Sequence, residues 1–114
     1  MLTSVGVPGA PSGKEPVIGT LTTVGQMSEP FEPVIGRPFY VSIWTDQTPF
    51  GGEQFYLCRS FDNGQNWTVV VDESITVIQV GSSKSYTSYE KGVLYAVELH
   101  WSSSGHGYNY RISQ

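Results

Sequence analysis

Few side chains in this chain of 114 residues are of a type and spacing that could carry out a reaction. There are one cysteine, Cys58, two histidines, His100 and His106, and ten carboxylates. Cys58 lies in the middle of an expected strand, where a buried thiol acting as a small hydrophobic side chain is the commoner arrangement. Two histidines supply too few ligands for a metal site. No carboxylate pair or nucleophile with its base has a spacing that fixes its geometry, so we expect a non-enzyme without a metal or cofactor.

The most specific short motif begins at Ser60 and reads S-F-D-N-G-Q-N-W. Ser60 and Asp62 can hydrogen-bond loop amides, and Asn63 with Gly64 can supply the positive φ values of a tight turn. The motif resembles the Asp-box, Ser-x-Asp-x-Gly-x-x-Trp, a hairpin of sialidase-type propellers. A propeller needs several four-stranded blades, which 114 residues cannot supply, so sialidase activity is not implied. We expect Ser60, Asp62, Gly64 and Trp67 to form a structural hairpin; ligand binding by Asp62 is the alternative.

The residues that follow position 38 form a pattern of short strands that would position this hairpin. Apolar and polar residues alternate from Phe39 onward, and no window has apolar residues at helical spacing over three turns. Seven strands are expected, at 39–44, 54–61, 67–72, 75–80, 85–90, 93–101 and 108–112. The pattern predicts an all-β domain over 37–114, an antiparallel β-sandwich of immunoglobulin-like or jelly-roll type. One strand is expected to turn a single face to the core, with Val93, Tyr95, Val97, Leu99 and Trp101.

Residues 1–36 differ in composition from the rest of the chain. Six of the seven prolines lie within the first 38 residues, interspersed with glycines, a composition that discourages helix and interrupts sheet pairing. We expect an extended N-terminal arm that packs on the sandwich, where it can add a strand to one sheet edge, on a neighbouring copy or on a partner. The apolar residues that would make the partner contacts are Val5, Val7, Val17, Ile18 and Phe31.

Charge and cysteine content narrow the classes of partner. The net charge is −4, and the six Lys and Arg residues are scattered along the chain, so nucleic acid is not an expected partner. The sequence has no apolar run long enough to cross a bilayer and no signal-peptide pattern at its start. A single cysteine cannot form an internal disulfide, which is consistent with assembly in a reducing cytoplasm.

Three stretches taken together resemble small virion proteins of tailed bacteriophages. They are P-F-Y-V-S-I-W from Pro38, L-C-R-S-F-D-N-G-Q-N-W from Leu57 and Y-R-I-S-Q from Tyr110. The resemblance implies a β-sandwich decoration or cement protein on the outer surface of the capsid, made in the host cytoplasm. It also implies binding to the major capsid protein and to neighbouring copies, with trimers as one expected oligomer, and stabilisation of the head. The arm would dock on these partners.

Two other functions are compatible with the same sequence. A carbohydrate- or receptor-binding module on a tail or head fibre would use exposed aromatic residues, and a head-to-tail connector component would be present in few copies. Core or interface positions are the more common use of aromatic residues in a small sandwich. The candidates for a sugar-binding face are Tyr86, Tyr89, Tyr108 and Tyr110.

Overall fold

The computed structural model describes residues 15–47, 52–72, 76–102 and 107–114, and the regular elements among them are all β-strands. The all-β class expected from the alternating sequence is therefore confirmed. The strands are β1 (Val17–Leu21), β2 (Pro38–Trp44), β3 (Gln54–Ser60), β4 (Thr68–Val69), β5 (Val77–Ile78), β6 (Ser83–Thr87), β7 (Leu94–Trp101) and β8 (Tyr108–Ser113).

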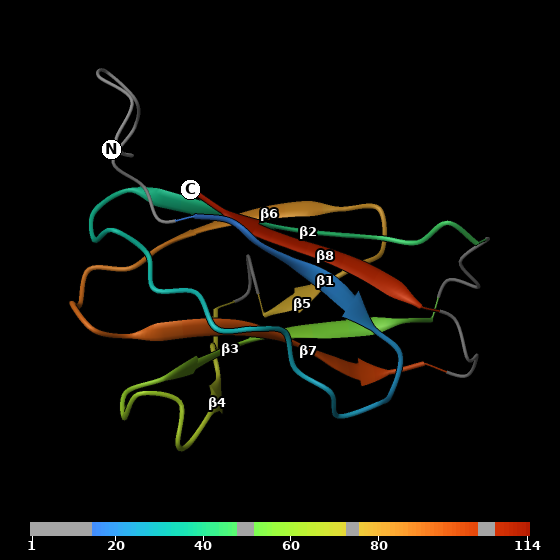
Figure 1. The fold of residues 1–114 in the computed structure, drawn as a ribbon, viewed down its shortest axis with the longest axis horizontal. Coiled ribbons are helices and arrows are strands. Elements are labelled where there is room, and N and C mark those ends of the chain that lie inside the picture. The colour runs from blue at the N-terminus through green and yellow to red at the C-terminus, as the bar shows by residue number, and fades with distance from the viewer. Residues whose placement is uncertain (1–14, 48–51, 73–75, 103–106) are drawn as a thin grey trace, which may run out of the picture.

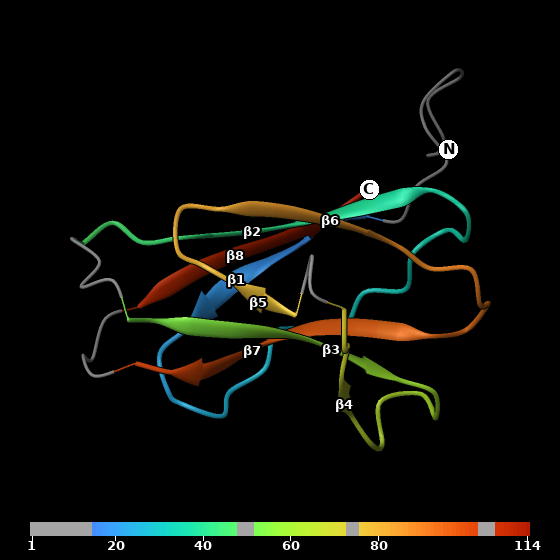
Figure 2. The ribbon, with the colours of Figure 1, turned by 180° about the vertical axis from the view of Figure 1, so that it is seen from behind.

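The strands form two antiparallel sheets that pack face to face, as the sequence predicts. One sheet has the order β1-β8-β2-β6, and in the other β3 pairs with β4, β5 and β7. The two layers are separated in both ribbon views, with β6, β2, β8 and β1 above β3 and β7 (Figures 1 and 2). β2 and β8 are the central strands of the first sheet, and each of them is hydrogen-bonded to a neighbouring strand on both edges.

The segment that follows β1 joins the two sheets along one side of the sandwich. β1 pairs with β8 over its whole length, so this part of the expected arm adds an edge strand. The chain then runs beside β7, where the N–H groups of Gly25, Ser28 and Phe31 donate to β7 carbonyls at 2.8 Å each. Residues 17–31 thus pack on the sandwich itself, which is one of the three arrangements that the sequence left open for the arm. Pro30 lies between paired positions, so its missing N–H breaks no hydrogen bond of this ladder.

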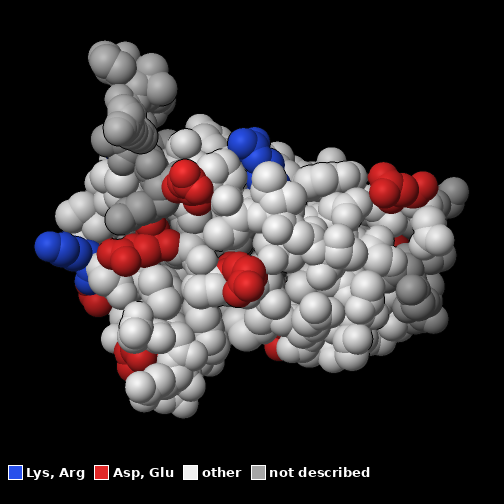
Figure 3. All heavy atoms as spheres, viewed as in Figure 1, with Lys and Arg blue, Asp and Glu red and all other residues white. Residues whose placement is uncertain are grey.

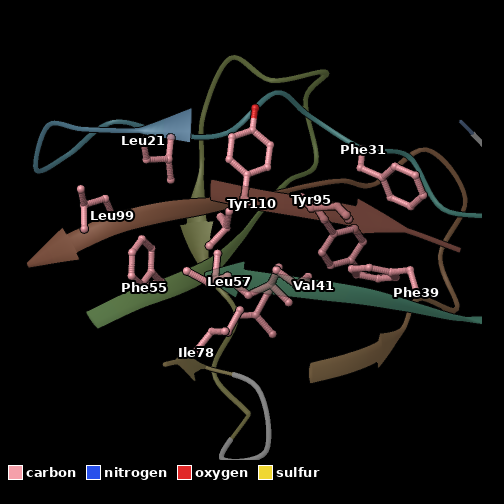
Figure 4. Close-up of a cluster of buried hydrophobic side chains, with 14 of the residues drawn as sticks. Leu21, Phe31, Phe39, Val41, Phe55, Leu57, Ile78, Tyr95, Leu99 and Tyr110 are labelled. Carbon is pink, nitrogen blue, oxygen red and sulfur yellow. The ribbon is translucent and has the colours of Figure 1, made fainter. Parts of the chain in front are cut away.

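The core consists of the inward-facing residues of the strands, which fill the space between the two sheets. Figure 4 shows Phe31, Phe39 and Tyr95 grouped at one end of this cluster, and the ring centroids of Phe39 and Tyr95 are 4.9 Å apart. Phe31, which composition assigned to a partner-binding arm, is only 2% exposed. Its side chain is a core residue because the ladder with β7 directs it between the sheets.

One residue of the expected core face of β7 lies outside the core. Tyr95, Val97 and Leu99 are buried as predicted, whereas Trp101 is 46% exposed. Phe55 pairs with Leu99 but Gln54 pairs with Trp101, so the register shifts at a bulge between them. A one-residue shift exchanges the two faces of a strand, which turns Trp101 away from the core.

Candidate functional site

The hairpin between β3 and β4 is held by the side chain of Ser60, which is fully buried. Its hydroxyl accepts hydrogen bonds from the backbone N–H groups of Gly64 (2.8 Å) and Asp62 (3.3 Å) and donates to the Asp62 carboxylate (2.7 Å). Asn63 and Gly64 have φ values of 60° and 90°, in the left-handed region that Asn and Gly tolerate best. The motif spacing therefore places a serine hydroxyl where turn amides need an acceptor.

Asp62 is engaged by its own loop at both carboxylate oxygens. Oδ1 accepts a hydrogen bond from the backbone N–H of Asn66 (2.9 Å), and Oδ2 accepts one from its side-chain amide (2.6 Å). These bonds, together with the one from Ser60, lower the pKa of Asp62 from 3.8 to about 2 although the side chain is exposed. Hydrogen bonds that stay within the loop give this carboxylate a role in holding the turn.

Trp67, the last residue of the motif, packs against the turn. A Cβ added at Gly64 would lie 3.8 Å from the Trp67 ring and 3.9 Å from the side chain of Leu94 on β7. The four predicted residues Ser60, Asp62, Gly64 and Trp67 therefore lie together in one hairpin, which projects from the sheet of β3 and β7 (Figure 1).

A cleft of about 320 Å³ opens next to this hairpin, at the end of the sandwich where the chain passes from β6 to β7. Its floor includes Tyr86 and Tyr95, whose ring centroids are 5.8 Å apart. The segment 87–90 forms one wall and is fixed by the buried Ser88, whose carbonyl accepts a hydrogen bond from Gly36 (2.8 Å). Arg59 and Phe61, at the end of β3, line the opposite side.

Arg59 is the unusual residue of the cleft. Its Nε is buried and has no hydrogen-bond partner, and its guanidinium lies over the Phe61 ring, 5.1 Å from the centroid. Within the described part of the chain the guanidinium forms no ion pair, although Glu90 also lines the cleft. Nε is closed to solvent, but the terminal nitrogens of this unpaired cation are not, which makes the cleft a candidate binding site.

The alternation of residues along β3 predicts that Arg59 faces inward, which composition alone does not show. Phe55, Leu57 and Arg59 share one face of the alternating strand, and the first two are fully buried. A cation at the third inward position of such a strand must either pair inside the protein or reach the open end of the core. No local feature of the sequence predicts that the segment around Tyr89 forms the facing wall of the cleft.

The outer face of the sheet β1-β8-β2-β6 is a second candidate site. Ile18 (63% exposed), Tyr40 (47%) and Trp44 (40%) are its exposed apolar side chains. The register places Ile18 opposite Arg111, and Arg111 opposite Ser42, which lies between the two aromatic residues along β2. Arg111 is exposed, so the face presents aromatic rings around one cation.

The predicted arm residues fall in three different environments. Val17 is half-buried, Ile18 is exposed on the outer face of β1, and Phe31 is in the core. Val5 and Val7 lie outside the described residues. Among residues 15–36, Ile18 is thus the predicted arm residue that remains accessible to a partner.

The four tyrosines considered for a sugar-binding face do not lie on one surface. Tyr108 and Tyr110 are buried at 0% and 4% exposure, because they are inward residues of β8. Tyr86 is partly buried in the floor of the cleft, whereas Tyr89 is 81% exposed at its rim. Tyr40 and Trp44, by contrast, do share one face, the outer face of the sheet β1-β8-β2-β6.

Cys58 and His100 are reactive side chains that lie outside the hairpin and the cleft. Cys58 is buried, which together with Glu98 raises the pKa of its thiol to about 11. The ring of His100 stacks on Tyr56 at 4.1 Å and lies 3.9 Å from the Glu98 carboxylate, while His106 lies outside the described residues. Within the described ranges, no three His, Cys, Asp or Glu side chains group as metal ligands, and no helix could span a bilayer.

Charged groups are dispersed on the face of the molecule drawn in Figure 3. Acidic side chains stand apart from one another there, and the described Lys and Arg residues form no continuous basic patch. Most of this face is uncharged.

Comparison with known protein families, with curated proteins and with solved structures found no match to this chain. The structure is a small antiparallel β-sandwich. Because such a fold does not imply a particular function, the function has to be inferred from the residues on its surface.

Proposed function

We propose that this protein is a capsid decoration or cement protein of a tailed bacteriophage, which binds the major capsid protein lattice from outside and stabilises the head. The observation that carries the proposal is the outer face of the sheet β1-β8-β2-β6, with Tyr40, Trp44 and Arg111 exposed together beside Ile18. Tyr, Trp and Arg are the residues most enriched at the energetic centres of protein interfaces.

The position of these residues in the sheet supports an interface better than scattered exposure would. Tyr40 and Trp44 belong to β2 and Arg111 to β8, the two strands that are paired on both sides. Residues on central strands are held in place before a partner arrives, so binding loses little conformational entropy. Neighbouring copies would also contact one another, for example as trimers. Many copies of this face would then bind the same capsid lattice.

The first test is the copy number of the polypeptide in purified phage particles, measured by quantitative mass spectrometry against the major capsid protein. A decoration protein should be present at about one copy per capsid subunit, or a simple fraction fixed by particle symmetry. A few copies per particle would contradict this role in favour of a tail or connector component. Absence from particles would overturn the assignment to a virion.

The second test is rebinding of variants to particles stripped of the protein. Trp44→Ala should weaken binding by about tenfold or more, as expected for a central aromatic contact. Trp101→Ala is the matched control, because Trp101 is 46% exposed against 40% for Trp44 but lies on the other sheet. Equal rebinding of both variants and the unchanged protein would show that this face is not the capsid contact.

The same face also favours one alternative function, binding of a saccharide. Tyr40 and Trp44 stand four residues apart on one strand, with Ser42 between them and Asn109 opposite Trp44. Aromatic rings flanking hydroxyl and amide groups suit the apolar faces and hydroxyls of sugars. A glycan array with the isolated protein tests this function: saturable binding lost in Trp44→Ala, with particles that stay stable without the protein, would replace the decoration role.

A further inference from the structure

We propose that the cleft at the β6–β7 end of the sandwich binds an acidic peptide segment of a partner protein, with the Arg59 guanidinium as the contact for a side-chain carboxylate. This site is separate from the outer face of the sheet β1-β8-β2-β6. The cleft is lined by Tyr86, Tyr89, Glu90 and Tyr95 besides Arg59 and Phe61, and none of these belongs to that face.

The charge and hydrogen bonding of Arg59 identify an anion as the group that the cleft lacks. The guanidinium has five N–H donors in a planar fork that matches a carboxylate. Its Nε is buried without a partner, and its guanidinium lies over the Phe61 ring. Nε itself is closed to solvent, so a carboxylate entering the cleft would accept from the terminal N–H groups of the guanidinium, which are not buried, and leave the Arg59–Phe61 stacking intact.

The rest of the cleft is preformed and largely aromatic. Tyr86 packs on Phe39 with ring centroids 6.0 Å apart and on Tyr95 at 5.8 Å, so the floor is part of the core. The wall is fixed where Gly36 donates to the Ser88 carbonyl. On the opposite side, the hydrogen bonds of the adjacent Ser60 hold the turn that carries Phe61. A preformed site of this kind favours binding because little has to be ordered on contact.

The exposure of the rim favours a peptide over a small free anion. Pockets for small molecules bury most of the surface of their ligand, whereas this cleft is open to solvent along its rim. Phe61 is 57% exposed and Tyr89 is 81% exposed, so much of each ring faces outward beyond the cleft. Those ring surfaces can contact apolar residues on either side of the acidic one, which only a chain that continues past the cleft provides.

The test uses NMR titration of the full-length protein with two capped tripeptides, Leu-Glu-Leu and Leu-Gln-Leu. We expect saturable shifts of the Arg59 Nε–H signal and of the Phe61 and Tyr89 amides with the acidic peptide. The glutamine peptide should bind about tenfold more weakly or not at all, because it removes the charge and keeps the shape. Equal affinity of the two peptides would overturn the proposal.

Variants separate this site from the outer face of the other sheet. Arg59→Met should abolish the preference for the acidic peptide, provided that its thermal unfolding shows a folded protein. Tyr89→Ala avoids that condition, since a side chain that is 81% exposed contributes little to folding, and it should weaken the acidic peptide several-fold. Tyr40→Ala is the matched tyrosine control and should leave peptide affinity unchanged. Unchanged affinity in Tyr89→Ala, or equal weakening in Tyr40→Ala, would contradict a site in the cleft.

A third arm of the titration distinguishes the source of the carboxylate. Benzoate carries the same anionic group on an aromatic ring but has no chain on either side. It should bind more weakly than the acidic tripeptide, since it cannot contact both rims. If benzoate binds as tightly as the peptide, the peptide assignment is wrong and the cleft is a site for small carboxylates.

Discussion

The hairpin that begins at Ser60 and the cleft that contains Arg59 are built from adjacent residues of one strand end, and they use their polar groups differently. In the hairpin the Ser60 hydroxyl and both Asp62 oxygens are engaged by groups of the same loop. In the cleft the Arg59 Nε is buried with no partner. Asp62 and Arg59 have opposite charges and stand three residues apart, yet they form no ion pair.

This difference separates the polar groups that hold the fold from a buried donor that the fold leaves unsatisfied. The Asp62 carboxylate already accepts hydrogen bonds from its own loop, so the turn does not need an ion pair with Arg59. The guanidinium is then left with an aromatic ring, which cannot replace a hydrogen-bond acceptor for Nε. Removing a polar group from the hairpin should therefore lower stability. Removing the Arg59 guanidinium from the cleft should leave stability nearly unchanged and weaken binding.

The largest stability effect is expected for Ser60→Ala. The side chain is fully buried, and its removal leaves the N–H of Gly64 without the acceptor at 2.8 Å. Ser60 also donates to the charged Asp62 carboxylate, and losing the hydrogen bonds of this hydroxyl should cost about 1–3 kcal/mol, visible as a lowered midpoint in urea unfolding. Ser42→Ala is the matched control, since Ser42 bonds to Ser83 at an exposed site and its loss should cost less than about 0.5 kcal/mol. Equal midpoints for the two variants would contradict the role given to Ser60.

A smaller loss is expected for Gly64→Ala, which tests the backbone of the turn rather than its side chains. Gly64 has φ of 90°, a conformation that costs an alanine about 1–2 kcal/mol. Space is not the obstacle, because the nearest atoms to an added Cβ are 3.8 Å away. Asn63→Gly is the control and should leave stability within about 0.5 kcal/mol, because glycine tolerates the φ of 60°. Unfolding of both variants by differential scanning calorimetry would measure this difference.

The hairpin could be predicted from sequence because all its interactions lie within eight residues. The alternation of apolar residues likewise located β2, β3, β7 and β8 to within one or two residues. The strands expected at 67–72 and 75–80 are much shorter in the structure, β4 and β5. Val70 is buried while Val71 is 90% exposed, and the Thr76 hydroxyl bonds to the Val70 carbonyl at 2.7 Å, so the chain turns where the pattern suggested a ladder.

Features that depend on distant segments had no such local signal. Phe31 reaches the core only because its segment pairs with β7, and Trp101 leaves the core only because of a bulge opposite Gln54. The cleft beside Arg59 is lined in part by the segment around Tyr89, which is distant from Arg59 in the sequence. Composition could count these residues but could not say which of them would meet.

Acid should weaken the hairpin by protonating the Asp62 carboxylate. The pKa of Asp62 is lowered from 3.8 to about 2, so its charged form is favoured by folding. The contribution is complete above pH 3.8 and is lost as the pH falls toward 2. We expect the difference in unfolding free energy between the unchanged protein and Asp62→Asn to shrink over this window. A difference that stays constant from pH 5 to pH 2 would show that the Asp62 charge does not stabilise the turn.

The smallest stability effect is expected for Arg59→Met, the counterpart of Ser60→Ala one residue earlier. Methionine keeps an apolar stem that ends about where Nε lies, and it removes both the donor that has no partner and the rest of the guanidinium. Replacing an unsatisfied buried polar group by an apolar one is neutral or stabilising, so the urea midpoint should stay the same or rise slightly. A loss of more than about 1 kcal/mol would mean that the guanidinium stabilises the fold itself, through Phe61 or the cleft wall. A stable Arg59→Met variant that no longer distinguishes the acidic tripeptide from its glutamine form would place the cation in binding rather than in folding.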